Sequence, residues 1–239
     1  MSLAIEKENN PIIQLIANNN KVKSICKHCR SANTFEMKLK RMFDVIFALF
    51  VLILLSPIFI IISLAIKIIS PDGPVFFAHK RIGLQGKEFD CLKFRTMQPN
   101  AEELLYKLLQ ENNQLKSEFS TDFKFKKDPR IIPIIGEFLR KSSFDELPQF
   151  LNSLMGNMSV VGPRPIIYGE IGKYGRELPK LLSIKPGITG LWQVSGRNNV
   201  SYSQRVTFDM TYVDKHNFLM DIKIIFKTIL VVLFRDGAY

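Results

Sequence analysis

The chain has 239 residues, a length that predicts one domain with an extension, or two small domains at most. Its formal net charge of +11 indicates an anionic partner, which a phosphorylated substrate, an acidic membrane leaflet or a nucleic acid would provide. Three cysteines are too few for a disulfide framework and no secretory signal opens the chain, so the sequence argues against a disulfide-stapled secreted protein and favours one facing the reducing cytosol.

Residues 1–36 are predicted to form a polar extension, because they are rich in Asn and Lys and contain only a short apolar patch. Cys26 and Cys29 lie three residues apart in this extension. A single such pair, without a second pair at zinc-ribbon spacing, is a weak signal for a metal site. The alternative is a reduced, exposed pair of thiols in a flexible arm.

Residues 45–66 form an apolar run without a charge, which as a straight helix would be about 33 Å long and could cross a hydrocarbon core. Ser56-Pro57 lies in the middle of this run. Proline removes a backbone hydrogen bond and kinks a helix, and the serine hydroxyl can satisfy a freed carbonyl. Cations flank both ends, whereas a spanning helix should show asymmetry. These residues leave two structures open, a plain span and a re-entrant hairpin. The flanking cations are Lys38, Lys40, Arg41, Lys67, Lys80 and Arg81.

Several shorter elements follow the apolar run. Residues 75–78 and 89–94 are predicted to be strands, and leucines at helical spacing predict a helix over 101–109. A last helix is predicted over 218–234, with Asn217 as its cap. This helix is strongly apolar yet carries lysines, so it would lie either in the membrane interface or in an ordinary core.

The acidic pair Asp145-Glu146 has two interpretations. In the structural one, Ser143 caps a helix and Glu146 completes a capping box, at a helix end where acids are favoured. In the functional one, a helix N-terminus and Arg140 form a phosphate pocket, in which an ionised carboxylate can attack phosphorus. Glu146 could then orient its neighbour or share a Mg²⁺ ion that neutralises a diphosphate.

Further cations are candidate phosphate ligands. Lys93 and Arg95 are two residues apart, hence on one face if the segment is extended. Arg164 stands between two prolines, so a bidentate phosphate clamp would lose little entropy on binding. A glycine-rich segment, 185–197, holds the only tryptophan and ends at Arg197. Each signal alone is weak, but together they place several cations around one acidic pair.

In this combination, residues 40–239 resemble the bacterial sugar transferases, the monotopic phosphoglycosyl transferases. The resemblance rests on the hairpin Ser56-Pro57, KFRTM at 93–97, DELPQ at 145–149, GPRP at 162–165 and PGITGLWQVSGR at 186–197. The ending RDGAY at 235–239 looks like that of members that start exopolysaccharide synthesis. The resemblance implies an α+β, mainly helical, membrane-associated domain over 37–239, with a re-entrant membrane helix over about 42–69 and interfacial amphipathic helices.

The resemblance also implies an activity. Asp145 would be the nucleophile and a Mg²⁺ ligand with Glu146 as its partner, Arg140 and Arg164 would hold the donor's phosphates, and Lys93, Arg95 and Arg197 would line the site. Asp221 falls on a family acidic position without an assigned role. The reaction would transfer a sugar 1-phosphate, favouring a hexose such as glucose or galactose over an N-acetylated sugar, from a UDP-sugar to undecaprenyl phosphate with release of UMP.

The expected location is the bacterial inner membrane, with the catalytic domain on the cytoplasmic face in contact with anionic lipids. The number of subunits stays open, a homodimer included.

A non-enzymatic membrane scaffold that recruits polysaccharide enzymes is the alternative function. The acidic pair with its cations argues against it. Nucleic-acid binding would explain the positive charge but not the uncharged apolar run, so a nucleic acid is not expected as a partner.

Overall fold

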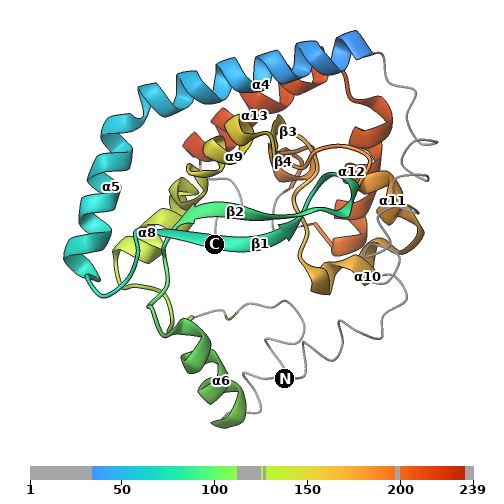
Figure 1. Cartoon of the computed structure of the whole chain (residues 1–239). Helices are drawn as coiled ribbons and strands as arrows, with labels where there is room; N and C mark the ends of the chain where they lie inside the picture. Colours follow the sequence, from blue (N-terminus) through green and yellow to red (C-terminus); the bar gives the residue numbers. More distant parts are fainter. Residues whose placement is uncertain (1–33, 112–124, 126–127, 197–199, 235–239) are drawn as a thin grey trace.

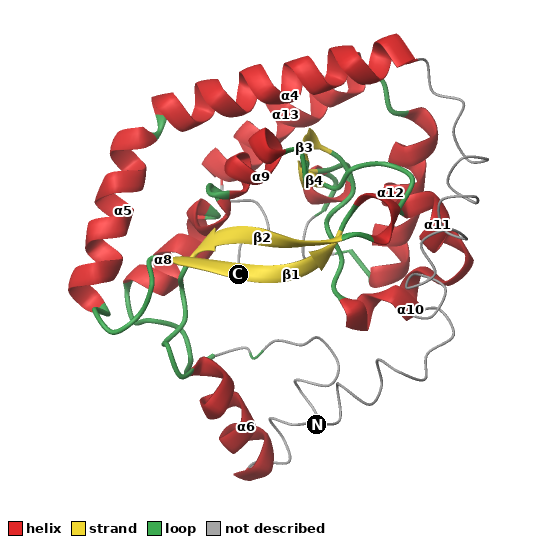
Figure 2. Cartoon of the chain, in the orientation of Figure 1, coloured by secondary structure: helices red, strands yellow, loops and turns green. Residues whose placement is uncertain are grey.

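The computed structural model describes residues 34–111, 125, 128–196 and 200–234. The extension with Cys26 and Cys29, Arg197 and the ending 235–239 lie outside these residues. Within the described part, helices surround a central two-stranded hairpin and a second small sheet (Figure 2). The predicted α+β, mainly helical class is therefore confirmed.

Two helices form a bent arm along the outside of the molecule (Figure 1). They are α4 (Thr34–Leu54) and α5 (Ser56–Ile69), which meet at an angle of 60°. Pro57 lies in the first turn of α5, and the Ser56 hydroxyl donates a hydrogen bond of 2.8 Å to the carbonyl of Ile53. The predicted break at Ser56-Pro57 is thus confirmed, and the serine satisfies a carbonyl near the end of α4.

Neither described helix of this arm, nor any other in the described ranges, is long and apolar enough to cross a membrane alone. By length and composition, the bent pair together suits a broken span or a re-entrant loop. Each helix of the arm has buried residues on the side that faces the core, Asp44 and Ala48 on α4 and Ile62 and Ile66 on α5. Around the bend, large apolar side chains are exposed instead: Leu49, Phe50, Ile53, Leu54, Ile60 and Ile61.

Most cations flanking the apolar run make contacts within the fold. Lys40 pairs with Asp221 at 2.5 Å, and Arg41 donates to two carbonyl groups at the end of α9 (Gln149–Met155) at 2.6 and 2.7 Å. Lys67 donates to two carbonyl groups in the turn after α5 at 3.2 and 3.0 Å. These cations therefore have a structural role within the fold. Their symmetric placement around the apolar run is not by itself a signal of membrane topology.

The central hairpin consists of β1 (Phe76–Ile82) and β2 (Glu88–Phe94), joined by the short turn η1 (Leu84–Gly86). The register pairs Phe77 with Lys93, which places both side chains on one face. The carboxamide of Asn152 on α9 donates to the Asp90 carbonyl and accepts from the Leu92 amide, at 2.7 and 2.8 Å. This single side chain satisfies part of the open edge of β2. Both predicted strands are confirmed, as is the helix that follows, α6 (Ala101–Glu111).

The remaining elements build the core beneath the arm. A parallel pair, β3 (Ser159–Val161) and β4 (Gly187–Thr189), is linked by short helical turns. These turns are η3 (Tyr168–Glu170), α10 (Ile171–Tyr174), η4 (Gly175–Glu177) and α11 (Leu178–Leu181), and η5 (Trp192–Val194) follows β4.

Two longer helices end the described chain, α12 (Tyr202–Lys215) and α13 (Phe218–Phe234). The predicted cap of α13 is confirmed, because the Asn217 side-chain oxygen accepts a hydrogen bond of 2.9 Å from the Met220 amide. Ile224 and Ile225 of α13 are buried in the core. Its other side exposes large apolar residues, so the helix serves the core and also presents an apolar surface. The exposed residues are Leu219, Phe226, Ile229 and Leu230.

Asp221 joins α13 to α4 and α12, because its carboxylate accepts from Lys40 at 2.5 Å and from the Tyr212 hydroxyl at 2.7 Å. We expect Asp221→Ala to lower the free energy of unfolding by about 3 kcal/mol, since it leaves the Lys40 charge without its carboxylate. Unfolding in lipid nanodiscs would measure this loss. Asp214→Ala is the matched control, because its carboxylate pairs with Lys180 on the surface and should matter by less than about 1 kcal/mol. Equal losses in the two variants would contradict the assigned role.

Candidate active site

The acidic pair lies in a single turn, η2 (Phe144–Glu146), between α8 (Ile135–Ser142) and α9. Ser143 has φ 60° and ψ 15°, the left-handed conformation that ends α8. Its hydroxyl caps no helix, and the Glu146 amide bonds to the Ser143 carbonyl instead. The capping box predicted for Ser143 and Glu146 is therefore wrong. Helix capping does not account for the two acids.

Lys93 reaches the acidic pair from β2. Its Nζ lies 2.7 Å from Oε1 of Glu146 and 3.3 Å from Oδ2 of Asp145. The three side chains are half-buried or buried, with 20% of Lys93, 12% of Asp145 and 29% of Glu146 exposed. The geometry is thus a charged triad, in which one ammonium group bridges two carboxylates that come from another part of the chain.

The two carboxylates differ in electrostatic environment. Burial acts to raise the pKa of Glu146, but Lys93, Arg164 and Arg81 outweigh it and hold that pKa at about 2. Burial raises the pKa of Asp145 above its usual value, and repulsion from Glu146 adds to this rise against the opposing charge of Lys93. Glu146 is therefore the fixed anion, while Asp145 is the more basic carboxylate of the pair.

Lys93 keeps its proton in this setting. Burial acts to lower the pKa of Lys93, but the charges of Glu146 and Asp145 outweigh it, so the pKa is raised. The triad therefore holds a permanent cation beside two acids. This ammonium group can bind a phosphate oxygen of a substrate.

The structure separates the predicted arginines. Arg140, on α8, lies close enough for its charge to lower the pKa of Asp145, and its Nε donates to the Thr96 hydroxyl at 3.0 Å. Arg95 is different, because its guanidinium bonds to the carbonyls of Pro74 and Ser70, each at 2.6 Å. β2 ends before Arg95, and its side chain ties the exit of α5 to the hairpin. The prediction that Arg95 lines the site is not supported, and Arg197 lies outside the described residues.

Arg164 is held on a rigid platform made by two chain segments. The Gly162 amide bonds to the Thr189 carbonyl at 2.9 Å, and the Gly187 amide to the Pro163 carbonyl at 2.7 Å. A Cβ on Gly187 would lie 2.0 Å from the Gly162 nitrogen, so only glycine allows this approach.

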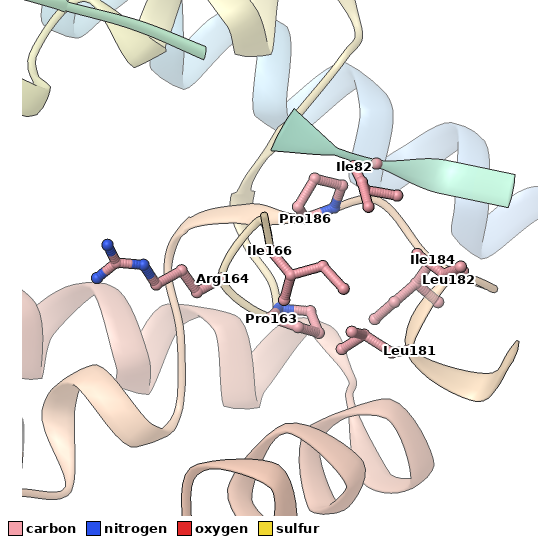
Figure 3. Close-up of a pocket in the computed structure, with 9 residues that line it drawn as sticks. Ile82, Pro163, Arg164, Ile166, Leu181, Leu182, Ile184 and Pro186 are labelled. Carbon is pink, nitrogen blue, oxygen red and sulfur yellow. The ribbon is translucent and has the colours of Figure 1, made fainter. Parts of the chain in front are cut away.

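Figure 3 shows the Arg164 guanidinium pointing away from the apolar side chains packed around Ile166. Those apolar residues, together with Gly83 and Arg164, line a cavity of about 10 Å³, with room for about one water molecule. A nucleotide therefore does not fit there, whereas the guanidinium itself is free of that packing.

Two residues of β1 belong to the site and were not predicted. Arg81 donates to the Pro165 carbonyl at 3.0 Å and so holds the loop that carries Arg164. His79 is kept neutral, because burial and then the charges of Arg81, Lys93 and Arg164 lower its pKa to about 4. Alternation along β1 puts both on the face that carries Lys93. Only the strand register shows this, so no local motif could have identified them.

The bent arm supports the site directly. Phe94 follows Lys93 in the sequence, and Phe144 precedes Asp145. Both pack in one apolar cluster with Ile62 and Ile66 of α5. The returning half of the arm therefore fixes the position of the triad.

The acidic pair can contribute to a metal site only in part. Among residues 34–111, 125, 128–196 and 200–234, no group of three or more His, Cys, Asp or Glu side chains could hold a metal ion. Mg²⁺ in phosphoryl-transfer sites is commonly bound by one or two carboxylates together with substrate phosphates. Asp145 and Glu146 fit this donor set, with the remaining oxygens supplied by a diphosphate.

The match to known proteins covers the arm, both sheets and the acidic pair. Residues 35–235 match the bacterial sugar transferase family, and the chain belongs to this family. The resemblance expected from the sequence motifs is thereby confirmed.

Three relatives illustrate the range of the family. The undecaprenyl-phosphate galactose phosphotransferase of Salmonella typhimurium is 49% identical over 201 residues, which are 84% of this chain and 42% of that protein. The exopolysaccharide production protein ExoY of Sinorhizobium fredii is 46% identical over 200 residues, 84% of this chain and 88% of that protein. The UDP-glucose:undecaprenyl-phosphate glucose-1-phosphate transferase of Escherichia coli is 36% identical over 209 residues, 84% of this chain and 41% of that protein. The chain thus spans about two fifths of the longer relatives.

Proposed function

We propose that this chain transfers a sugar 1-phosphate from a UDP-sugar to undecaprenyl phosphate, releasing UMP, as the first step in the synthesis of an exopolysaccharide or another surface glycan. The observation that carries the proposal is the charged triad of Lys93, Asp145 and Glu146, with arginines on either side. Two of the relatives are named for undecaprenyl-phosphate sugar phosphotransfer, which supports it.

The proposed reaction has two displacement steps at one phosphorus atom. An Asp145 carboxylate oxygen attacks the β-phosphorus of the UDP-sugar, and the bond to the bridging oxygen breaks, so that UMP leaves with that oxygen. An oxygen of undecaprenyl phosphate then attacks the same phosphorus and releases the Asp145 carboxylate. The product is a lipid diphosphosugar, and one phosphoanhydride has replaced another.

The other side chains bind and orient the donor. Arg164 and Arg140 approach the pair from separate elements, which suits binding of the diphosphate, and Lys93 would move from the carboxylates to a phosphate oxygen. Glu146 stays ionised, and its charge favours the protonated form of Lys93. Asp145, with Glu146 beside it, would hold a Mg²⁺ ion that neutralises part of the diphosphate charge.

The Arg164 contact gives a measurable expectation. Arg164→Ala should lower kcat/KM for the UDP-sugar by roughly 10- to 150-fold, the loss of one charge-assisted contact of about 1.5 to 3 kcal/mol, with little loss of stability. Steady-state UMP release would measure it. Arg176→Ala, an exposed arginine of η4, is the control and should behave like wild type. Unchanged donor use in well-folded Arg164→Ala protein would remove this residue from the site.

We also propose that the bent arm enters the bilayer from the cytoplasmic face and returns to it, with the exposed apolar residues around the bend in the acyl region. The exposed lysines of α13, Lys223 and Lys227, lie beside its exposed apolar residues, which suits contact with anionic headgroups.

Cysteines introduced near residues 30 and 75, in protein with Cys26 and Cys29 replaced by serine, should be labelled from the same side of the membrane. Pro57→Leu should straighten the arm and shift part of the protein toward a true span. Labelling of the two sites from opposite sides in the Pro57-containing protein would rule out the re-entrant arrangement.

The competing hypothesis is a membrane scaffold without catalysis. A UMP-release assay with undecaprenyl phosphate across a panel of UDP-sugars distinguishes it from the transferase. We expect release with UDP-glucose or UDP-galactose in preference to N-acetylated donors. A protein that binds membranes but releases UMP from no donor would favour the scaffold.

A further inference from the structure

A second buried acid lies on α12, outside the triad. Asp209 is 1% exposed, and its Oδ2 accepts a hydrogen bond of 2.7 Å from the Tyr174 hydroxyl. Its Oδ1 has no hydrogen-bond partner within the described part of the chain. A buried carboxylate with so few hydrogen bonds costs stability when it is ionised. Keeping an acid at this position therefore indicates a role other than stabilising the fold.

The charges around Asp209 connect it to the donor-binding arginine. Arg205 lies four residues before Asp209, on the same face of α12, with its Cζ 4.7 Å from the centre of the Trp192 ring. The Cζ of Arg164 lies 5.9 Å from the centre of that same ring. Two guanidinium groups gathered on one indole repel each other unless an anion is close. Asp209 is a buried acid whose pKa both arginines lower, and its Oδ1 and the Arg205 Nε are both buried without a hydrogen-bond partner in the described part of the chain.

Glu170, another acid near these arginines, already has binding partners of its own. Glu170 lies 3.7 Å from Arg81 and accepts a hydrogen bond of 2.9 Å from the Ile167 amide. Asp209 has no such ion pair at salt-bridge distance within the described ranges. Its negative charge is therefore available to the arginine pair at Trp192.

We propose that Asp209 is a positioning residue, whose carboxylate holds Arg205 and Arg164 together at Trp192 and so keeps Arg164 ready to bind the donor's diphosphate. The inference rests on the proposed function, in which Arg164 contacts the donor. Asp209 itself is too deeply buried to touch a substrate.

The arrangement predicts a pH dependence. Burial raises the pKa of Asp209 to about 7, although the Tyr174 hydrogen bond and the charges of Arg164 and Arg205 each act to lower this pKa. The groups that face it are Tyr174 on α10, Tyr202 and Arg205 on α12, Glu170 on η3 and Arg164 after β3. As pH falls through about 7, Asp209 takes up a proton and its hold on the arginines is lost. The KM for the UDP-sugar should therefore rise about tenfold between pH 8 and pH 6, with a smaller change in kcat.

Replacing Asp209 should weaken donor binding without lowering the stability of the fold. A pKa raised in the folded state means that folding disfavours the ionised form, so the cost grows as pH rises above the unfolded pKa and is complete above the folded pKa of about 7. Asp209→Asn should thus be at least as stable as wild type at pH 8, although it binds the donor less well. A merely structural role would predict lost stability instead.

The test is the KM for the UDP-sugar from pH 6 to pH 8, with thermal unfolding at pH 8. Asp209→Asn should show the high KM at every pH. Tyr174→Phe removes a hydrogen bond to the ionised acid, so its rise in KM should begin at higher pH. Asp214→Asn, an exposed acid on the same helix, is the control and should keep the wild-type profile.

Two results would overturn the inference: a wild-type KM at pH 8 in Asp209→Asn, or a loss of stability that accompanies its loss of affinity. If wild-type protein turns over no UDP-sugar at all, the proposed function fails and the inference falls with it. If wild-type protein is active and Asp209→Asn keeps its KM profile, the inference alone fails.

Discussion

Asp145→Asn is expected to reduce turnover by at least about 10³-fold, because an amide cannot attack phosphorus in the proposed first step. Asparagine has the size of aspartate and fits the same turn. The pKa of Asp145 is raised in the folded protein by burial and by Glu146, so its ionised form is disfavoured by folding above its unfolded pKa. Removing this charge should leave the protein at least as stable at pH 8. UMP release and unfolding in nanodiscs measure the two quantities.

The matched control is Asp90→Asn, an exposed acid of β2 that pairs with Lys80 on the surface. It should keep the wild-type rate. A capping role for the acidic pair would have predicted the reverse pattern, a stability loss of about 1 kcal/mol with activity retained. Asp145→Asn protein with more than a tenth of wild-type turnover would exclude Asp145 as the nucleophile.

Lys93→Met is also expected to have a large effect, a fall of about 10²-fold or more in kcat/KM at neutral pH. The substitution removes the ammonium that bridges both carboxylates and that would bind a donor phosphate. Because Lys93 lowers the pKa of Asp145 and of Glu146, its removal raises both. More Asp145 is then protonated at a given pH, so the acid limb of the pH–rate profile should move to higher pH and the deficit should grow as pH falls.

Lys93→Arg separates charge from shape in the same experiment. It keeps the positive charge, so its acid limb should stay close to that of wild type even if its rate falls through altered geometry. A Lys93→Met profile that is lower but has the wild-type shape would show that Lys93 does not set the protonation state of the nucleophile.

The elements that the sequence predicts correctly are those determined by the properties of neighbouring residues. Ser56-Pro57 breaks the arm because proline cannot continue the backbone hydrogen bonding, a property of the residue itself. Alternation and leucine spacing locate β1, β2 and α6, and Asn217 marks the start of α13. The structure also brings Lys93 from the 93–97 motif to the acidic pair, while the catalytic roles of these three side chains stay a prediction.

The errors arise where a local pattern has more than one tertiary outcome. Ser143 and Glu146 match a capping box in spacing, but α8 continues to Ser142 and turns Ser143 into the residue that ends it. Arg95 matches Lys93 by alternation, yet its partners, Ser70 and Pro74, come from the exit of the arm.

The unpredicted residues have a different origin. His79 and Arg81 belong to the site only because β1 pairs with β2 in one register and lies beside the loop of Arg164. The proposed role of Asp209 depends on the Trp192 ring, which is 17 residues away in the chain. Such relations depend on the folded arrangement, and a single sequence without its relatives does not encode them in any local motif.

The proposed covalent intermediate on Asp145 is tested most directly by withholding the lipid acceptor. Wild-type protein is incubated with Mg²⁺ and a UDP-sugar labelled in the sugar, without undecaprenyl phosphate. We expect a burst of about one UMP per protein, with label on the protein that hydroxylamine removes and that peptide mapping places on Asp145. Adding undecaprenyl phosphate should then move the label to lipid. UMP that appears only after the acceptor is added, with no labelled protein trapped, would contradict the covalent intermediate and assign direct transfer between the two substrates.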